Sequence, residues 1–309
     1  METLFLKSAN DDLNLATAFC EPQNSDNQEV PKGIVQIVHG MCEHKERYYP
    51  FMEYLCSKGW VCVIHDHRGH GGSVRSAEDL GYMYDGGWDA MIEDIETVRK
   101  WSSEKWPSLK RVLLGHSMGS MAVRGYVKRY DSFVDTLIVC GSPSENPMAG
   151  AGRLLAKMTA AFSRKGWRHR PQILQKMSFG SFNRPFEDEG YPCAWVCSDK
   201  GTLEDYHADP LCQFVFTANG FYNLLGLMKY CYSPKGWAMK NPGMKVRFIS
   251  GEKDPCRGSD RQHESSVRLM REVGYTDVDS RIFPGMRHEI LNEADKALVW
   301  GYVLQEITE

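Results

Sequence analysis

Residues 111–120 read Arg-Val-Leu-Leu-Gly-His-Ser-Met-Gly-Ser, and this stretch decides the fold. An apolar strand that ends at Leu114 is followed at once by the start of a helix. Between them, Gly115 and Gly119 flank Ser117 in a Gly-x-Ser-x-Gly pattern, which is typical of a sharp strand-to-helix turn. Such a turn strains the serine backbone and brings neighbouring chain close, so only glycine fits at the flanking positions. We therefore predict that the Ser117 hydroxyl stands above a sheet edge, over a helix N-terminus that favours negative charge.

Short apolar runs alternate with amphipathic helical stretches on both sides of this turn. That alternation predicts an α/β fold with a mostly parallel sheet covered by helices on both faces. The expected strands are 3–7, 13–20, 33–38, 60–65, 111–114, 136–140, 245–250 and 280–283, and the expected helices are 46–57, 88–101, 118–128, 260–273 and 292–306.

The alternation stops between residues 144 and 235, which are rich in helix formers and aromatic residues. We predict that 144–235 form a helical cap, or lid, inserted into a body made of 1–143 and 236–309. From 146 to 186 the charged residues are all basic. Either the apolar helix face of this segment packs on the body, or the cap meets an anionic or amphiphilic substrate or a membrane surface. That face comprises Leu154, Leu155, Met158, Ala161 and Phe162.

The overall composition excludes several classes of protein. The chain has 309 residues, of which 42% are hydrophobic and 25% charged, as in ordinary globular proteins. The formal net charge is −3, whereas a general nucleic-acid binder would be strongly basic. No apolar run approaches the ~18 residues of a membrane span. Residues 1–12 lack the apolar region of a signal peptide, so we expect a cytoplasmic protein.

The ten cysteines are scattered along the chain, with no Cys-x-x-Cys pair and no zinc-finger spacing. Several lie in apolar runs, such as Cys62 and Cys140. We interpret them as reduced thiols that act as small core residues of a cytosolic protein, and we expect no metal.

A serine hydroxyl needs a base to remove its proton, and that base needs an acid to orient it. Asp254 follows the seventh expected strand and His288 follows the eighth. Both therefore lie with Ser117 at the carboxyl edge of the sheet, where such sheets place their sites. We predict Ser117, His288 and Asp254 as nucleophile, base and acid. Glu252 is an alternative acid, and Glu289 a weaker one.

Two backbone N–H groups are expected to bind the oxyanion that forms during such a reaction. One is the N–H of Met118, the residue after the nucleophile. The other is the N–H of Met41, in the loop after the strand 33–38, where Gly40 permits a tight turn. We interpret the side chain of His39 as a packed, hydrogen-bonded histidine rather than a catalyst.

Four blocks of this sequence, closed by His288, resemble one known family. The chain looks like an α/β-hydrolase of the lysophospholipase and monoacylglycerol lipase type, in the serine aminopeptidase-type hydrolase family. The resemblance implies an eight-stranded α/β-hydrolase fold, a helical cap, no cofactor, and a triad of the same serine, acid and histidine. The blocks are His39-Gly-Met-Cys-Glu-His-Lys-Glu-Arg-Tyr48, Asp66-His-Arg-Gly-His-Gly-Gly-Ser73, Gly115-His-Ser-Met-Gly119 and Gly251-Glu-Lys-Asp254.

One departure concerns Met41, since family members often carry glycine or alanine there; a narrower mouth of the acyl pocket is expected. From these features we expect a serine esterase that hydrolyses lipid-like acyl esters, such as monoacylglycerols or lysophospholipids, through an acyl-enzyme. The expected partner is a small acyl ester, with transient membrane or micelle contact through the basic cap; the oligomeric state stays open. The residues expected to bind substrate are His39, Gly40, Phe179, Phe182, Phe214, Phe216, Phe221 and Met228.

Three alternatives remain beside this hypothesis. The run from His65 to His70 packs three histidines and an acid into six residues, as a metal hydrolase would. A hydrolase-fold binding protein with little turnover would lack part of the triad, and none is missing here. A serine aminopeptidase of the same fold would need cap acids to hold a free amine. The acids available are Glu187, Asp188, Glu189, Asp199, Glu204, Asp205 and Asp209.

Overall fold

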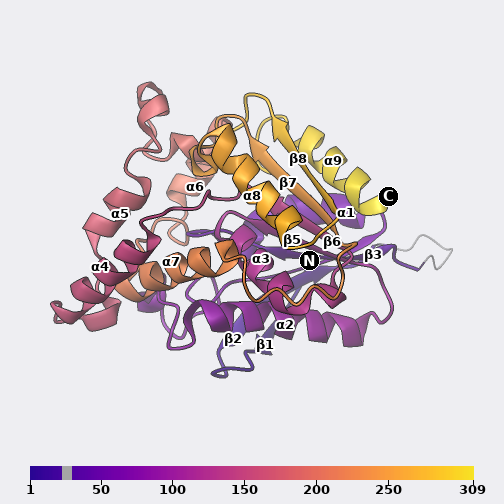
Figure 1. Ribbon diagram of the computed structural model, residues 1–309, viewed down its shortest axis with the longest axis horizontal. Coiled ribbons are helices and arrows are strands. Elements are labelled where there is room, and N and C mark those ends of the chain that lie inside the picture. The colour runs from indigo at the N-terminus through magenta and orange to yellow at the C-terminus, as the bar shows by residue number, and fades with distance from the viewer. Residues whose placement is uncertain (23–29) are drawn as a thin grey trace.

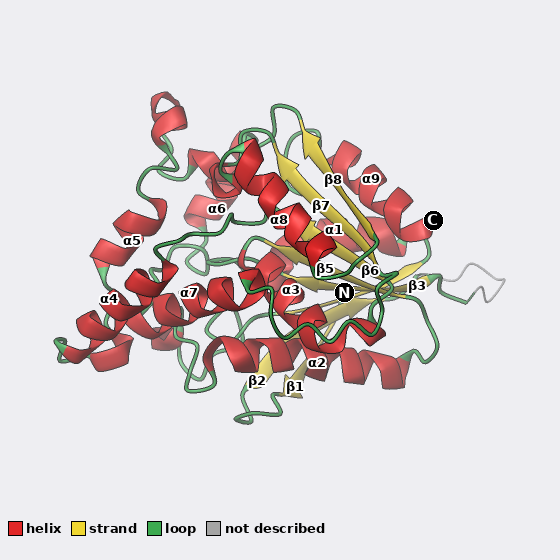
Figure 2. Ribbon diagram, viewed as in Figure 1, coloured by secondary structure: helices red, strands yellow, loops and turns green. Residues whose placement is uncertain are grey.

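The computed structural model describes residues 1–22 and 30–309, and its centre is one eight-stranded sheet (Figure 2). The strand order is β1-β2-β4-β3-β5-β6-β7-β8. β1 and β2 run antiparallel to their neighbours, while all other pairs are parallel. The predicted mostly parallel eight-stranded sheet is therefore confirmed. The strands are β1 (Glu2–Lys7), β2 (Asn14–Cys20), β3 (Gly33–Val38), β4 (Trp60–His65), β5 (Arg111–His116), β6 (Thr136–Cys140), β7 (Lys245–Gly251) and β8 (Asp277–Phe283).

Apolar side chains cover both faces of the central strands, which is why these strands read as continuous apolar runs. In β5, Leu113 faces one core cluster, while Val112 and Leu114 face the other. α1 and α9 cover one face, and α2, α3 and α8 cover the opposite face (Figure 1). The helices are α1 (Tyr49–Cys56), α2 (Gly87–Lys105), α3 (Met118–Tyr130), α4 (Ala149–Ala161), α5 (Gln172–Phe179), α6 (Lys200–Ala208), α7 (Ala218–Tyr232), α8 (Asp260–Glu272) and α9 (Lys296–Thr308). No helix in this described part of the chain is long and apolar enough to cross a membrane.

Two element boundaries differ from the sequence prediction. The expected helix 46–57 divides into a 3-10 turn, Lys45–Tyr48, and α1, because Pro50 lies in the first turn of α1 and starts a new helix there. The expected helix 292–306 begins only at Lys296. The buried carboxylate of Glu293 instead accepts a hydrogen bond from the backbone N–H of Arg287.

Residues 141–244, which we call the insertion, connect β6 to β7 and carry α4, α5, α6 and α7. Figure 1 shows α4, α5 and α6 together at the end of the molecule opposite the C-terminus. α7 packs on α2, α3 and α4, so it links the outer helices to the body. Its buried side chains share one apolar core with α2 and α3.

The apolar face predicted on α4 points to solvent. Leu154, Met158 and Phe162 are 59%, 47% and 87% exposed. Leu155 of the same face is partly buried against the core, so the expectation that this face packs on the body is wrong for the three exposed residues and right for Leu155. α4 instead buries Ala149, Ala156 and Ala160, because small side chains let it approach α7 closely.

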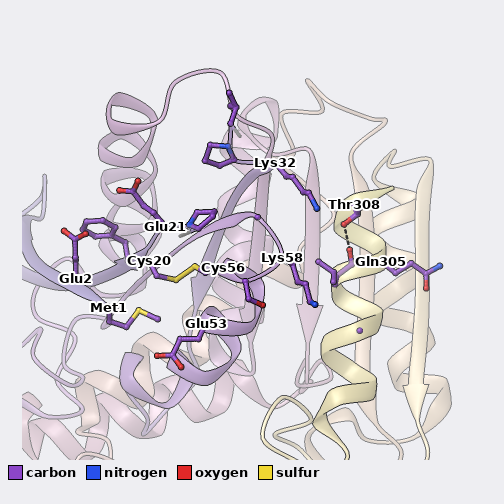
Figure 3. A pocket seen from close by; sticks show the side chains of 18 of the residues that line it. Met1, Glu2, Cys20, Glu21, Lys32, Glu53, Cys56, Lys58, Gln305 and Thr308 are labelled. Carbon is purple, nitrogen blue, oxygen red and sulfur yellow. Dashed lines mark hydrogen bonds between the residues drawn. A yellow bond between two sulfur atoms is a disulfide. The ribbon is translucent and has the colours of Figure 1, made fainter. Parts of the chain in front are cut away.

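Cys20 and Cys56 form a disulfide that joins the end of β2 to the end of α1. The interpretation of all ten cysteines as reduced thiols is wrong for these two, while the other eight are free. The disulfide lies in the wall of a hollow of about 1300 Å³ that also borders Lys32 and Lys58 (Figure 3). This hollow is at the amino ends of β3 and β4, far from the predicted catalytic residues.

We expect the disulfide to stabilise the fold by constraining the unfolded chain. A double substitution, Cys20→Ala with Cys56→Ala, should lower the free energy of unfolding by about 3–4 kcal/mol under oxidising conditions. Urea unfolding with and without reductant measures this difference. Reductant should destabilise the wild type but not the variant; equal sensitivity of both proteins to reductant would contradict the assignment.

Candidate active site

Ser117 occupies the turn between β5 and α3 with φ +53°, in the left-handed region that a non-glycine residue rarely adopts. The two flanking glycines allow this turn. A Cβ on Gly119 would lie 2.1 Å and 2.4 Å from the carbonyl oxygens of Val38 and His39. A Cβ on Gly115 would lie 2.4 Å from the Gly119 carbonyl oxygen. The nearest atoms at both positions are backbone, with a Val123 methyl group also close to Gly115, so no larger residue fits without moving β3 or α3.

The three side chains predicted as catalytic form one hydrogen-bonded row. His288 Nε2 is 2.8 Å from Ser117 Oγ, and His288 Nδ1 is 3.0 Å from Asp254 Oδ1. Asp254 and His288 are only 3% and 4% exposed. The backbone N–H of Cys256 donates to Asp254 Oδ1 and holds the carboxylate in place. In this arrangement the imidazole can accept the serine proton at Nε2 while Nδ1–H stays bonded to the acid.

The alternative acids point elsewhere. Glu252 accepts a hydrogen bond from the backbone N–H of Gly285. Glu289 is held by two hydrogen bonds from Arg47, at 2.5 Å and 2.6 Å. Asp254 is therefore the carboxylate that contacts His288 in the described structure.

His39 fixes the loop that carries the predicted oxyanion donor Met41. His39 Nδ1 bonds to the Gly40 carbonyl oxygen at 2.8 Å, and the His67 backbone N–H donates to His39 Nε2 at 2.9 Å. Because Nε2 accepts a hydrogen bond, Nδ1 carries the proton and the ring is neutral. Burial, together with His67, lowers the pKa of His39 well below its usual value. In a trans peptide the Met41 N–H points away from the Gly40 carbonyl oxygen. The hydrogen bond from His39 to that oxygen therefore also sets the direction of the Met41 N–H.

The buried carboxylate of Glu43 joins three parts of the site. It accepts hydrogen bonds from the Gly40 backbone N–H, from Tyr48 Oη at 2.9 Å and from His116 Nδ1 at 3.0 Å. Arg47 adds an ion pair at 3.1 Å. These contacts connect the Met41 loop to the residue that precedes Ser117. Gly40, Arg47 and Tyr48 lie in the same sequence block as Glu43, but His116 is 73 residues away, so the link to the Ser117 turn could not be predicted from the sequence.

The same contacts determine the charge states of Glu43 and His116. Burial alone would raise the pKa of Glu43, but the hydrogen bond and charge of His116, with Arg47, lower it to about 2. Burial alone would lower the pKa of His116, but Glu43 raises it. His116 Nε2 lies 3.3 Å from the His288 carbonyl oxygen, which can accept a hydrogen bond from it. A buried ion pair thus lies directly beneath Ser117 and His288.

A pocket of about 500 Å³ opens beside Ser117 and His288. Of the predicted substrate-binding residues, Phe179, Phe182, Phe214 and Met228 line it. Its wall also contains residues that sequence reasoning missed: Met121, Trp195, Val196, Val215, Leu224 and Leu225. Helical spacing was the available signal for two of them, since Leu224, Leu225 and Met228 share one face of α7.

Four predicted substrate-binding residues do not line this pocket. Phe216 and Phe221 are fully buried in the core, where their rings pack against each other. His39 and Gly40 lie behind the wall, where they hold the Met41 loop. These four residues therefore pack the core or support the loop instead of lining the pocket. Met41, in that loop, does border the pocket.

The histidine-rich run does not form a metal site. Asp66 accepts hydrogen bonds from the Lys45 backbone and ammonium groups and from the Gly72 backbone. His65, His67 and His70 are buried in contact with one another's rings. Among the described residues, the groups that bring three donor atoms within 4.8 Å lie elsewhere.

We expect the Glu43 ion pair to contribute to stability in a pH-dependent way. Because the folded pKa of Glu43 is depressed to about 2, its contribution is present above pH ~4.5 and is lost as the pH falls toward 2. Glu43→Gln should therefore lower the free energy of unfolding at pH 7 by about 3 kcal/mol, with a smaller loss at acid pH. Urea unfolding at pH 7, 4 and 3 measures the effect, with Glu53→Gln on the exposed face of α1 as the control. An identical pH dependence in wild type and E43Q would contradict the assigned charge state.

Comparisons with known proteins find ester hydrolases among the relatives of this chain. Monoacylglycerol lipase from Mycolicibacterium smegmatis is 27% identical over 272 residues, which cover 87% of this chain and 85% of that protein. A thermostable carboxyl esterase from Bacillus coagulans, solved with glycerol, superposes with a TM-score of 0.88 at 28% identity, over 99% of this chain and 97% of that one.

A more distant structure shares the fold. A soluble variant of monoglyceride lipase from Saccharomyces cerevisiae matches with a TM-score of 0.71 at 18% identity, over 99% of this chain and 96% of that one. The model of the Hydrolase_4 family, described as serine aminopeptidase S33, matches residues 29–295. The chain therefore belongs to this family of α/β-hydrolases.

Proposed function

We propose that the protein is a serine esterase that hydrolyses lipid-like carboxylic esters through an acyl-enzyme. Ser117 Oγ attacks the ester carbonyl while His288 takes its proton, and Asp254 holds the imidazole in the required tautomer. His288 then protonates the leaving alcohol, and a water molecule releases the acid by the same route. The row of hydrogen bonds at 2.8 Å and 3.0 Å is the observation that carries this proposal.

The negative charge of the tetrahedral intermediate needs donors that are already in position. We assign the backbone N–H groups of Met41 and Met118 to this role. The first is oriented by the His39 bond to the Gly40 carbonyl, and the second belongs to the first turn of α3. Each such donor contributes ~3–4 kcal/mol to stabilising the transition state.

The pocket favours an ester over a peptide with a free amino terminus. A free amine would need an unpaired carboxylate, yet the acids that border the pocket are Glu43 and Glu289. Glu43 is bonded to His116, and Glu289 to Arg47. The insertion acids that could have held an amine do not line the pocket. Glu189 bonds to Arg287 and Asp209 to His44, so neither carboxylate is unpaired.

The apolar wall of the pocket suits an acyl chain. Aromatic and aliphatic side chains from the insertion face Ser117 across the cavity, among them Phe179, Phe214 and Met228. Residues 144–235 would thus act as a cap over the acyl group, and α7 would anchor that cap to the body. The carboxyl esterase and monoacylglycerol lipases to which this chain is similar support an acyl ester as the substrate.

The exposed apolar face of the insertion supports contact with a lipid surface. Leu154 and Met158 on α4 and Phe162 directly after it are exposed, and the exposed bases Lys157, Arg164 and Lys165 lie within three residues of them in the sequence. Apolar side chains flanked by bases bind anionic membrane surfaces. Arg168, by contrast, pairs with Asp79 and so ties the insertion to the body.

Labelling with a fluorophosphonate tests the nucleophile. The probe phosphonylates an activated serine, so wild type should be labelled at Ser117 and Ser117→Ala should lose all labelling. Ser178→Ala is the control, because Ser178 also lines the pocket but makes no contact with His288. Gel fluorescence and peptide mass spectrometry report the site. Persistent labelling of S117A would refute the assigned nucleophile.

Vesicle binding tests the surface. Reversing Lys157, Arg164 and Lys165 to glutamate should weaken binding to anionic phospholipid vesicles by about tenfold or more, since each base near the surface contributes about 1 kcal/mol. Cosedimentation measures the bound fraction. A matched triple reversal away from the insertion, of Lys7, Lys58 and Arg261, should have a smaller effect. If both triple variants bind equally, the proposed surface is wrong.

A further inference from the structure

A second cluster of chemically reactive side chains lies where the insertion meets the body. His44 begins the 3-10 turn after the Met41 loop, while Asp209 and Cys212 follow α6 in the insertion. His44 Nε2 is 2.6 Å from Asp209 Oδ2. One donor atom each from His44, Asp209 and Cys212 lie within 4.8 Å of one another. Imidazole, carboxylate and thiolate are the three ligand types that zinc takes from proteins.

The other groups of this kind have a function already. Cys20 and Cys56, which lie beside Cys62, are joined to each other in the disulfide. Asp254 and His288, which lie beside Cys256, are bonded in the catalytic row. Among the described residues, the cluster around His44 is the remaining group of three donors. Its members form no disulfide and take no part in the proposed reaction.

The surroundings of His44 have the pattern found around metal-binding histidines. Its second nitrogen, Nδ1, is 2.5 Å from Glu46 Oε2. A carboxylate on one ring nitrogen fixes the imidazole orientation, and the other nitrogen, Nε2, faces the second proposed ligand, Asp209. Asp209 is likewise held, because its Oδ1 accepts the backbone N–H of Leu211 at 2.8 Å. Both ligands are therefore oriented before an ion binds.

The charges near the cluster permit a cation. Arg47 is neutralised by Glu289 and Glu43, and Lys45 by Asp66 and Glu46. His44 and Cys212 are 6% and 3% exposed, which keeps their donor atoms away from bulk water. The Asp209 side chain is 29% exposed, so an ion can reach the cluster from solvent on that side.

We propose that His44, Asp209 and Cys212 bind a zinc-type divalent ion that fastens the insertion to the body. Binding forms bonds to His44 Nε2, an Asp209 oxygen and Cys212 Sγ, and it releases the imidazole and thiol protons at those atoms to solvent. A tetrahedral ion with bonds of about 2.0–2.3 Å spaces its ligands about 3.3–3.6 Å apart. His44 Nε2 and Asp209 Oδ2 are now closer than this, at 2.6 Å, and the three donor atoms lie within 4.8 Å of one another, so an ion that enters must separate His44 from Asp209; water supplies the fourth ligand.

Cobalt(II) reports this site directly, independently of any ester hydrolysis. Full-length protein, treated with chelator and then freed of it, is titrated with Co²⁺ and afterwards with Zn²⁺. Wild type should bind one ion per chain, with a thiolate-to-cobalt charge-transfer band and the visible bands of a tetrahedral ion. Zn²⁺ should displace the cobalt and raise the unfolding temperature, because an ion that binds only the folded state stabilises it.

The variants identify the ligands. Cys212→Ser should abolish the charge-transfer band, and Asp209→Asn should weaken binding at least tenfold while keeping the Leu211 contact. Cys193→Ser is the matched control. Cys193, like Cys212, lines the pocket beside Ser117, but it is in none of the clusters found among the described residues, so this variant should bind the ion as wild type does. Circular dichroism checks that each variant is folded. Absence of a thiolate band in wild type, or an unchanged band in C212S, would overturn the proposal.

Discussion

The close approach of α3 to the end of β3 is the constraint on which the site depends. Gly119 lets the first turn of α3 rest against the carbonyl groups of Val38 and His39, at distances that exclude any side chain. This contact brings two chain segments together that each supply one proposed oxyanion donor. It also holds Ser117 in a left-handed conformation, which turns the hydroxyl toward His288. A single backbone contact thus sets the position of Ser117 relative to both proposed oxyanion donors.

The buried ion pair of Glu43 and His116 adds a second constraint, on the loop that carries Met41. Glu43 bonds to the Gly40 N–H on one side and to His116 on the other, so the loop that carries Met41 is tied to the turn that carries Ser117. Burying such a pair costs desolvation energy, which its hydrogen bonds offset only when all of them are made. The arrangement is therefore rigid, and a rigid set of dipoles is what electrostatic stabilisation of a transition state requires.

Sequence reasoning located the elements whose signals are local. The turn at Ser117 and the positions of Asp254 and His288 follow from strands that end at one sheet edge, and the structure brings these three side chains together. Contacts between segments that are far apart in the sequence could not be predicted from the sequence alone. The Cys20–Cys56 disulfide depends on α1 packing beside β2, and the Glu43 contacts span the chain. Phe214 and Phe216 lie on the same side of their segment and their rings stack, yet only Phe214 borders the pocket, because Phe216 lies deeper and packs against Phe221 in the core.

The central claim is that this site cleaves acyl esters and not peptides with a free amino terminus. Steady-state kinetics on one preparation, with medium- and long-chain monoacylglycerols, p-nitrophenyl esters, lysophospholipids and aminoacyl anilides, tests it most directly. We expect a kcat/KM for the preferred ester at least ~100-fold above that for any anilide, because both acids at the pocket are already paired. Aminoacyl anilides cleaved as efficiently as the best ester would contradict it.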